Sequence, residues 1–119
     1  TGVLVRERVH GVVESSVRVP VEVATTWITM GAVERVPVVR DVDTGPGGIT
    51  RRFAEAGYTL TYEDVTSARL PGFTERERLD VDAGQPVSDV WRRSYEGDRV
   101  VKASNRVINP LLHQLVHRY

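Results

Sequence analysis

The sequence predicts an α+β fold, an antiparallel sheet with helices packed on one face, from three observations. Polar and apolar residues alternate in two stretches near the start of the chain and in two near its end, as they do in strands. Short polar segments separate the two members of each pair, which is typical of hairpins. The helical patterns lie only between the pairs, without the regular alternation of strand and helix that builds a parallel sheet. The expected order is β-β-α-β-α-β-β with a C-terminal tail.

The first two strands are predicted by valines at every second position. One strand runs from Val3 to Val13 and the next from Val17 to Ile28. The alternating residues are Val3, Val5, Val9 and Val13 in the first, and Val17, Val19, Val21 and Val23 in the second. The polar residues 14–16 indicate an antiparallel hairpin, although Gly11 could also mark a bulge. Pro20 favours an edge or bulge position because it cannot donate to a ladder.

A long connection and a short helix come next. Residues 29–46 carry glycine and proline, and they end in the run 43–48, which has no side-chain period and forces a turn or loop. Beyond it, helical spacing relates three apolar residues, which are Ile49, Phe53 and Ala56. Gly57 stands where a C-terminal cap belongs, so a short amphipathic helix is expected to end there.

The second half of the chain predicts three strands and one helix. Alternation over residues 58–70 predicts a strand with Leu60, Tyr62 and Val65 on its inner face. Thr74 and Glu77 match a capping box, whose helix runs to about Leu79. The last two strands, Val87 to Tyr95 and Val100 to Ile108, form a hairpin through residues 96–99. The spacing in the tail suits a helix or a final strand, with apolar residues at Leu111, Leu112, Leu115 and Val116.

The composition predicts one globular domain that does not itself bind DNA. The 119 residues suffice for one core, and 40% of them are hydrophobic. The 16 Lys and Arg residues balance the 16 Asp and Glu residues, so the chain lacks the basic excess that neutralises phosphates. The absence of cysteine, of a signal pattern and of any apolar run near the roughly 18 residues of a membrane span predicts a cytoplasmic protein.

The search for catalytic groups predicts none. His113 and His117 have the spacing of two metal ligands on one helix, but no glutamate follows the first of them as in a zincin motif, and His10 lies far away. No serine lies in a nucleophile elbow, and the carboxylates form no evident acid and base pair. We therefore expect no catalytic residue, no metal site and no cofactor.

Two motifs suit an anionic ligand. Gly47 and Gly48 precede the first helix, where uncovered backbone N–H groups make an anion cradle; the alternative is a tight loop that needs glycine. Arg6 and Arg8 project from one face of a strand with His10 and could clamp a carboxylate or phosphate. The alternative for this pair is a solvated face with ion pairs across the hairpin, to Glu7, Glu14 or Glu22.

Three groups of segments, taken in order, resemble the UTRA domain, the effector-binding module of GntR-type bacterial transcription regulators. They are residues 3–8 with 19–28, residues 43–49 with 52–58, and residues 84–87 with 91–95 and 98–101. Together they cover nearly the whole chain. The resemblance implies a chorismate-lyase-like fold, an effector pocket beside the sheet, and a homodimeric repressor that binds DNA through an N-terminal winged helix-turn-helix domain not present in residues 1–119.

The resemblance also implies which residues bind the effector, a small anionic metabolite. Arg6 and Arg8 would hold its acidic group, with the amides of Gly47 and Gly48 at the helix start. Thr26 and Lys102 complete the expected set. The chain differs from sugar-phosphate sensors at Ala24 and at Lys102, where carboxylates are expected, so the resemblance favours a more acidic or less sugar-like effector.

One further departure and two alternatives stay open. UTRA domains have another strand and helix before the Arg-x-Arg strand, so the expected pocket is incomplete without them. The first alternative is a small lyase on the same fold, with the arginine pair binding substrate carboxylates. The second is a purely structural dimerisation module with a vestigial pocket.

Overall fold

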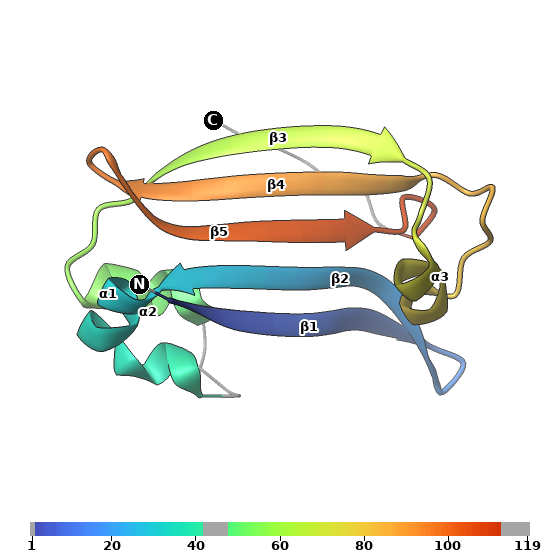
Figure 1. Ribbon diagram of the computed structural model, residues 1–119. Coiled ribbons are helices and arrows are strands. Elements are labelled where there is room, and N and C mark those ends of the chain that lie inside the picture. The colour runs from blue at the N-terminus through green and yellow to red at the C-terminus, as the bar shows by residue number, and fades with distance from the viewer. Residues whose placement is uncertain (1, 42–47, 113–119) are drawn as a thin grey trace. The chain divides into compact units, whose positions relative to one another are not determined.

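The protein folds into a five-stranded antiparallel sheet with short helices, so the α+β class is confirmed (Figure 1). The computed structural model describes residues 2–41 and 48–112, without the side chain of residue 14. Its elements are β1 (Val3–Glu14), β2 (Val17–Thr29), α1 (Met30–Arg35), the 3-10 helix η1 (Pro37–Arg40), α2 (Gly48–Glu55), β3 (Thr61–Arg69), α3 (Phe73–Leu79), β4 (Val87–Glu96) and β5 (Arg99–Ile108). The strand order is β1-β2-β5-β4-β3.

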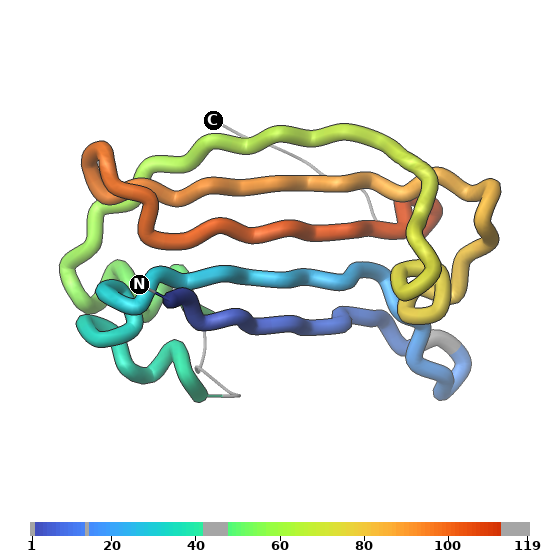
Figure 2. Tube along the Cα trace, viewed as in Figure 1, coloured from blue at the N-terminus to red at the C-terminus, as the bar shows by residue number. Residues whose placement is uncertain are grey.

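Both predicted hairpins are confirmed, and Figure 2 traces them along the chain. Ser15 and Ser16 join β1 to β2 with φ values of 48° and 65°, the two positive angles of a turn whose twist matches that of the strands. Gly97 has a φ of 60° in the turn between β4 and β5. Gly11 lies where β1 approaches β2 closely, because a Cβ atom there would stand 2.5 Å from the carbonyl oxygen of Val19.

Four details of the sequence prediction are wrong. Residues 29–46 include α1 and η1, which are too short to show a helical period. The N-cap of α3 is Gly72, and the capping carboxylate is that of Glu75, at 2.9 Å from the Gly72 amide nitrogen. β3 is an edge strand whose residues Thr61 to Ala68 are all exposed, so Tyr62 and Val65 face no core. Pro20 lies in β2, an inner strand, so the expected edge position is wrong, whereas the bulge that was the other expectation stays a prediction.

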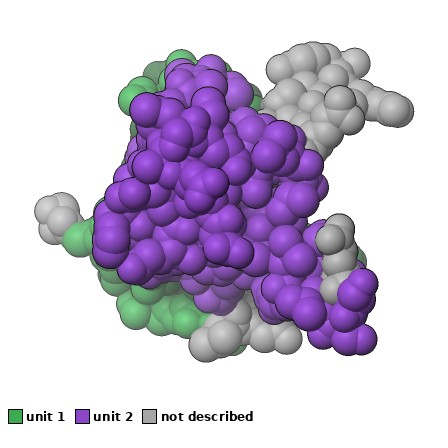
Figure 3. Space-filling model, turned by 90° about the vertical axis from the view of Figure 1, so that its right-hand side faces the viewer, with its two compact units in different colours: residues 1–6, 26–64, 92–104 green, residues 7–25, 65–91, 105–119 purple. Residues whose placement is uncertain are grey.

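The chain divides into two compact units, which Figure 3 colours separately. Unit 1 comprises residues 1–6, 26–64 and 92–104; unit 2 comprises residues 7–25, 65–91 and 105–119. Each unit has its own buried cluster of hydrophobic side chains. Each unit therefore supplies its own packing energy.

The core of unit 1 is built where α1, η1 and α2 meet β2 and β5. Phe53 is fully buried, and its ring meets that of Tyr58 edge to face, with 5.0 Å between centroids. The other buried members are Ile28, Ala32, Val33, Val36, Val39 and Val101. The predicted helical spacing of Ile49, Phe53 and Ala56 is thus correct, because all three side chains pack in or against this cluster.

The C-terminal end of α2 is a Schellman motif, as the predicted cap at Gly57 requires. The Tyr58 amide donates to the Phe53 carbonyl at 3.1 Å, and the Gly57 amide donates to the Ala54 carbonyl at 3.0 Å. Gly57 has a φ of 90°, in the region that side chains avoid.

Replacement of Gly57 with alanine is expected to lower the free energy of unfolding by about 1 kcal/mol or more, since φ stays positive. Gly31→Ala is the matched control, because Gly31 lies within α1 and no atom lies within 4 Å of the place that a Cβ atom would take there. The control is expected to be neutral or stabilising by up to about 1 kcal/mol. Urea denaturation measures the free energy of unfolding of both variants. Equal effects of the two substitutions would contradict the positive φ assigned to Gly57.

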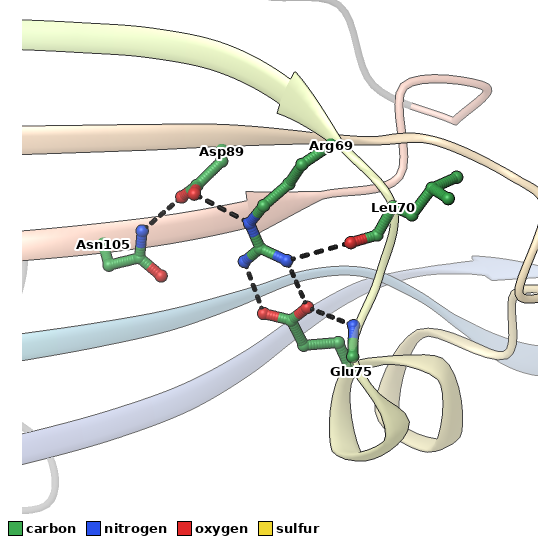
Figure 4. Close-up of polar contacts among 6 residues, drawn as sticks. Arg69, Leu70, Glu75, Asp89 and Asn105 are labelled. Carbon is green, nitrogen blue, oxygen red and sulfur yellow. Dashed lines mark hydrogen bonds and ion pairs between the residues drawn. The ribbon is translucent and has the colours of Figure 1, made fainter.

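Unit 2 packs α3 against parts of β2, β4 and β5. Leu79 and Val87 are almost completely buried, with Val23, Val107 and the partly buried Val81 around them. Beside this cluster, Arg69 at the end of β3 connects three elements (Figure 4). Its guanidinium donates to both carboxylate oxygens of Glu75 at 2.7 Å and, through Nε, to Asp89 at 2.8 Å. Asn105 donates to the other oxygen of Asp89.

The valine face of β1 is exposed. The exposed fractions are 53% at Val3, 54% at Val5 and 74% at Val13, whereas Leu4 and Arg6 are partly buried. The alternation therefore predicts the strand correctly, but the partly covered face is the one that carries the arginines.

Candidate functional site

The predicted effector-binding residues are divided between the two units. Arg6, Thr26, Gly48 and Lys102 belong to unit 1, whereas Arg8 belongs to unit 2. Gly47 lies outside the described residues. The candidate site that the structure supports is therefore built from unit 1.

The first turn of α2 and the side chain of Lys102 form the centre of this site. Gly48 begins α2 with a φ of 63° and has open space around the position of a Cβ atom. The Nζ atom of Lys102, on β5, lies 3.4 Å from the Thr50 hydroxyl oxygen. The first turn of α2 contains no acidic residue. A cation therefore lies beside the positive end of a helix dipole.

Lys102 is electrostatically uncompensated within the part of the chain that the structure describes. No carboxylate there forms a salt bridge with it. Burial, and secondarily the charge of Arg92, lower the pKa of the Lys102 ammonium. Its Nζ atom lies 5.8 Å from the centroid of the Phe53 ring. An anion placed here would relieve the repulsion and supply the missing counter-charge.

Arg6 holds the end of η1 in place. Its Nη1 atom donates to the backbone carbonyl of Val39, in the last turn of η1, and to that of Asp41, the C-cap residue of η1. Carbonyls at the end of a helix lack partners within the helix, and a guanidinium satisfies them well. Arg6 therefore positions residues 37–41, and direct contact between Arg6 and an effector stays a prediction.

Arg8 has a local backbone contact in unit 2. Its Nη1 atom donates to the carbonyl of Glu7 at 3.1 Å. The carboxylate of Glu7 pairs with Arg78, and that of Glu22 pairs with Arg106 at 2.6 Å. The predicted role of Arg8 in effector binding stays a prediction.

The sequence did not indicate the buried charges of unit 2. Glu22 and Asp89 are 9% and 8% exposed, and each is paired with an arginine. The signal was a charged residue between buried valines, as in Val21-Glu22-Val23. Because each carboxylate is held by its own guanidinium, we interpret both pairs as structural.

A second feature that the sequence did not indicate is a hollow of about 280 Å³ in unit 1. Its charged lining is Arg35, Glu96 and Arg99, and its remaining lining is Thr29, Gly31, Ala32, Tyr58, Val100 and Val101. Arg35 belongs to α1, the helix that the sequence did not predict, so its position could not be anticipated.

Two features are absent from the described residues. Within residues 2–41 and 48–112, no three His, Cys, Asp or Glu side chains are grouped as metal ligands would be. No helix in this part of the chain is long and apolar enough to cross a membrane.

Comparisons with known proteins identify the fold. No family model matches the chain, and no curated protein sequence matches it. Among solved structures, the effector domain of PhnF from Mycobacterium smegmatis matches with a TM-score of 0.74 and 22% identity, over 98% of this chain and 70% of that one. The C-terminal domain of the histidine utilization repressor from Pseudomonas syringae pv. tomato matches with a TM-score of 0.68 and 20% identity, over 98% of this chain and 95% of that one.

A third solved structure has the same fold. It is the ligand-binding domain of a putative GntR-family transcriptional regulator from Bordetella bronchiseptica, with a TM-score of 0.67 and 16% identity, over 85% of this chain and 64% of that one. The chain thus has the fold of the effector domains of GntR-type regulators, which confirms the fold that the resemblance to UTRA domains predicted.

Proposed function

We propose that this chain is the effector-sensing domain of a GntR-type transcription regulator. A small anionic metabolite binds in unit 1 and changes the DNA affinity of the full-length homodimer. The observation that carries the proposal is the fold match over 98% of the chain to a domain described as an effector domain. The uncompensated Lys102 beside α2 supports an anionic ligand.

The anion binds at the start of α2. Lys102 supplies the positive charge, and the amides of the first turn of α2, from Gly48, supply hydrogen-bond donors. Thr26 of β2 remains a proposed member of the site. Arg6 contributes by fixing the end of η1.

The regulatory step is a shift between two arrangements of the dimer. The effector prefers one arrangement by about 1 to 3 kcal/mol, the usual size of allosteric coupling. DNA is bound by a winged helix-turn-helix domain on the N-terminal side of this chain. The name of one neighbour, the C-terminal domain of a repressor, supports this organisation.

A thermal-shift screen of the purified chain tests effector binding. Phosphosugars, organic acids and acyl metabolites are the probes, because a ligand that binds only the folded state raises the melting temperature. In Lys102→Met, the affinity for an anion is expected to fall about tenfold or more, since a charged hydrogen bond contributes about 1.5–3 kcal/mol. Without anion, this variant is expected to be at least as stable as the wild type, because the buried charge is gone.

Arg93→Met is the matched control. Arg93 forms an exposed ion pair with Glu63 on β3, so its removal takes away the same charge without touching α2. The control should bind the anion as the wild type does. If every anion that binds the wild type binds Lys102→Met equally well, the proposed site is overturned, and the absence of any binding anion would favour the structural module.

A further inference from the structure

We propose that the hollow in unit 1 lined by Arg35, Glu96 and Arg99 is a second small-molecule site, and that it takes a small organic carboxylate. It is separate in composition from the proposed effector site, because none of its lining residues is Arg6, Thr26, Gly48 or Lys102. The inference therefore stands without the proposed function.

Arg35 provides a guanidinium that is already fixed. Its carbon Cζ lies 4.0 Å from the centroid of the Tyr58 ring, and its Nη2 atom donates to the carbonyl of Ala56 at 3.3 Å. Its Nη1 atom lies 3.4 Å from both carboxylate oxygens of Glu96. Since the contacts with Tyr58 and Ala56 hold the side chain before a ligand arrives, binding costs little conformational entropy.

The contact between Arg35 and Glu96 is loose. Charge-assisted hydrogen bonds are normally about 2.7–2.9 Å long, and this pair is at 3.4 Å with side-chain exposures of 45% and 37%. An exposed pair of this kind contributes about 0–1 kcal/mol. A ligand carboxylate can therefore compete with Glu96 for the guanidinium at small cost.

Arg99 supplies the second positive charge. It opens β5 next to the turn at Gly97, is exposed, and forms no salt bridge with any residue that the structure describes. With Arg35 and Glu96, the charged lining carries a net charge of +1, from two arginines and one glutamate. The lining therefore favours an anion.

The size and the apolar walls define the class of anion. Ala32, Tyr58 and Val101 are buried, with exposures of 3%, 9% and 7%, and line the hollow beside the exposed Val100. The volume of about 280 Å³ is at the lower limit of ligand pockets. A compact carboxylate with a short apolar body fits this combination better than a phosphosugar.

Calorimetric titration of the intact chain with succinate, glutamate and butyrate tests the proposal. At least one of them should bind, and Arg99→Gln should weaken that binding about tenfold or more. Lys102→Met and the exposed-charge control Arg93→Gln should bind it as the wild type does. Because Arg99 is exposed, we expect Arg99→Gln to fold normally. A circular dichroism spectrum equal to that of the wild type would show this.

Two outcomes would overturn the proposal, and they differ from each other. If Lys102→Met loses carboxylate binding and Arg99→Gln keeps it, the carboxylate binds at α2. That result would support the proposed effector site and contradict the proposed second site. If none of the three carboxylates binds at about 10 mM, a tenfold excess over a weak Kd of about 1 mM, the hollow is not a carboxylate site.

Discussion

Replacement of Phe53 with alanine is expected to lower the free energy of unfolding by about 3–5 kcal/mol. The ring is fully buried at the meeting point of α1, η1 and α2, where it contacts Tyr58 edge to face. Its removal deletes buried apolar surface and leaves a cavity that the short helices cannot fill. Because domains of this size are stable by about 5–15 kcal/mol, a large part of the stability would be lost.

Urea denaturation followed by the fluorescence of Trp27 and Trp91 measures the change. Phe73→Ala is the matched control, because Phe73 is the other phenylalanine of the chain and is 67% exposed at the start of α3. In the control, the free energy of unfolding should fall by no more than about 0.5 kcal/mol. Similar losses in the two variants would mean that α2 does not pack as described.

The elements that the sequence predicted well are those with a long local period. β1, β2, β4 and β5 have 10 to 13 residues each, enough for alternation to be visible, and the segments that join them in pairs are short and polar. α1 has six residues with two buried side chains, Ala32 and Val33, which is too few to define a helical period. The edge position of β3 was not predictable, because strand order depends on pairing between segments far apart in the sequence.

Some parts of the candidate site were likewise predictable from local sequence, and others were not. The helix start at Gly48 was predictable, since glycine and helical spacing are local signals. The contact between Lys102 and Thr50 joins residues 52 positions apart, and no local pattern reports it. The hollow combines residues from α1, β4, β5 and the segment after α2, so its chemistry became visible only in three dimensions.

In unit 2, Arg69→Met is expected to lower the free energy of unfolding at neutral pH by about 2–4 kcal/mol. The substitution leaves the buried carboxylate of Asp89 with Asn105 as the remaining partner in Figure 4, and an uncompensated buried charge is costly. The expected loss is below that of a fully buried pair, because the Arg69 side chain is 38% exposed.

The effect of Arg69→Met depends on pH in a defined direction. Hydrogen bonding to Arg69 lowers the pKa of Glu75 from its ordinary value of 4.5. The stability that this lowered pKa contributes is present above pH 4.5 and is lost as the pH falls through the folded-state value. The difference in stability between wild type and Arg69→Met should therefore narrow in acid.

Two further variants make the test of the Arg69 network specific. Arg93→Met removes an arginine from an ion pair whose side chains are 63% and 57% exposed, and should cost less than about 1 kcal/mol. Arg69→Met combined with Asp89→Leu removes the uncompensated charge and should recover part of the lost stability, because apolar groups can replace a buried ion pair. If the double variant is less stable than Arg69→Met alone, the loss comes from packing around α3 rather than from the isolated charge of Asp89.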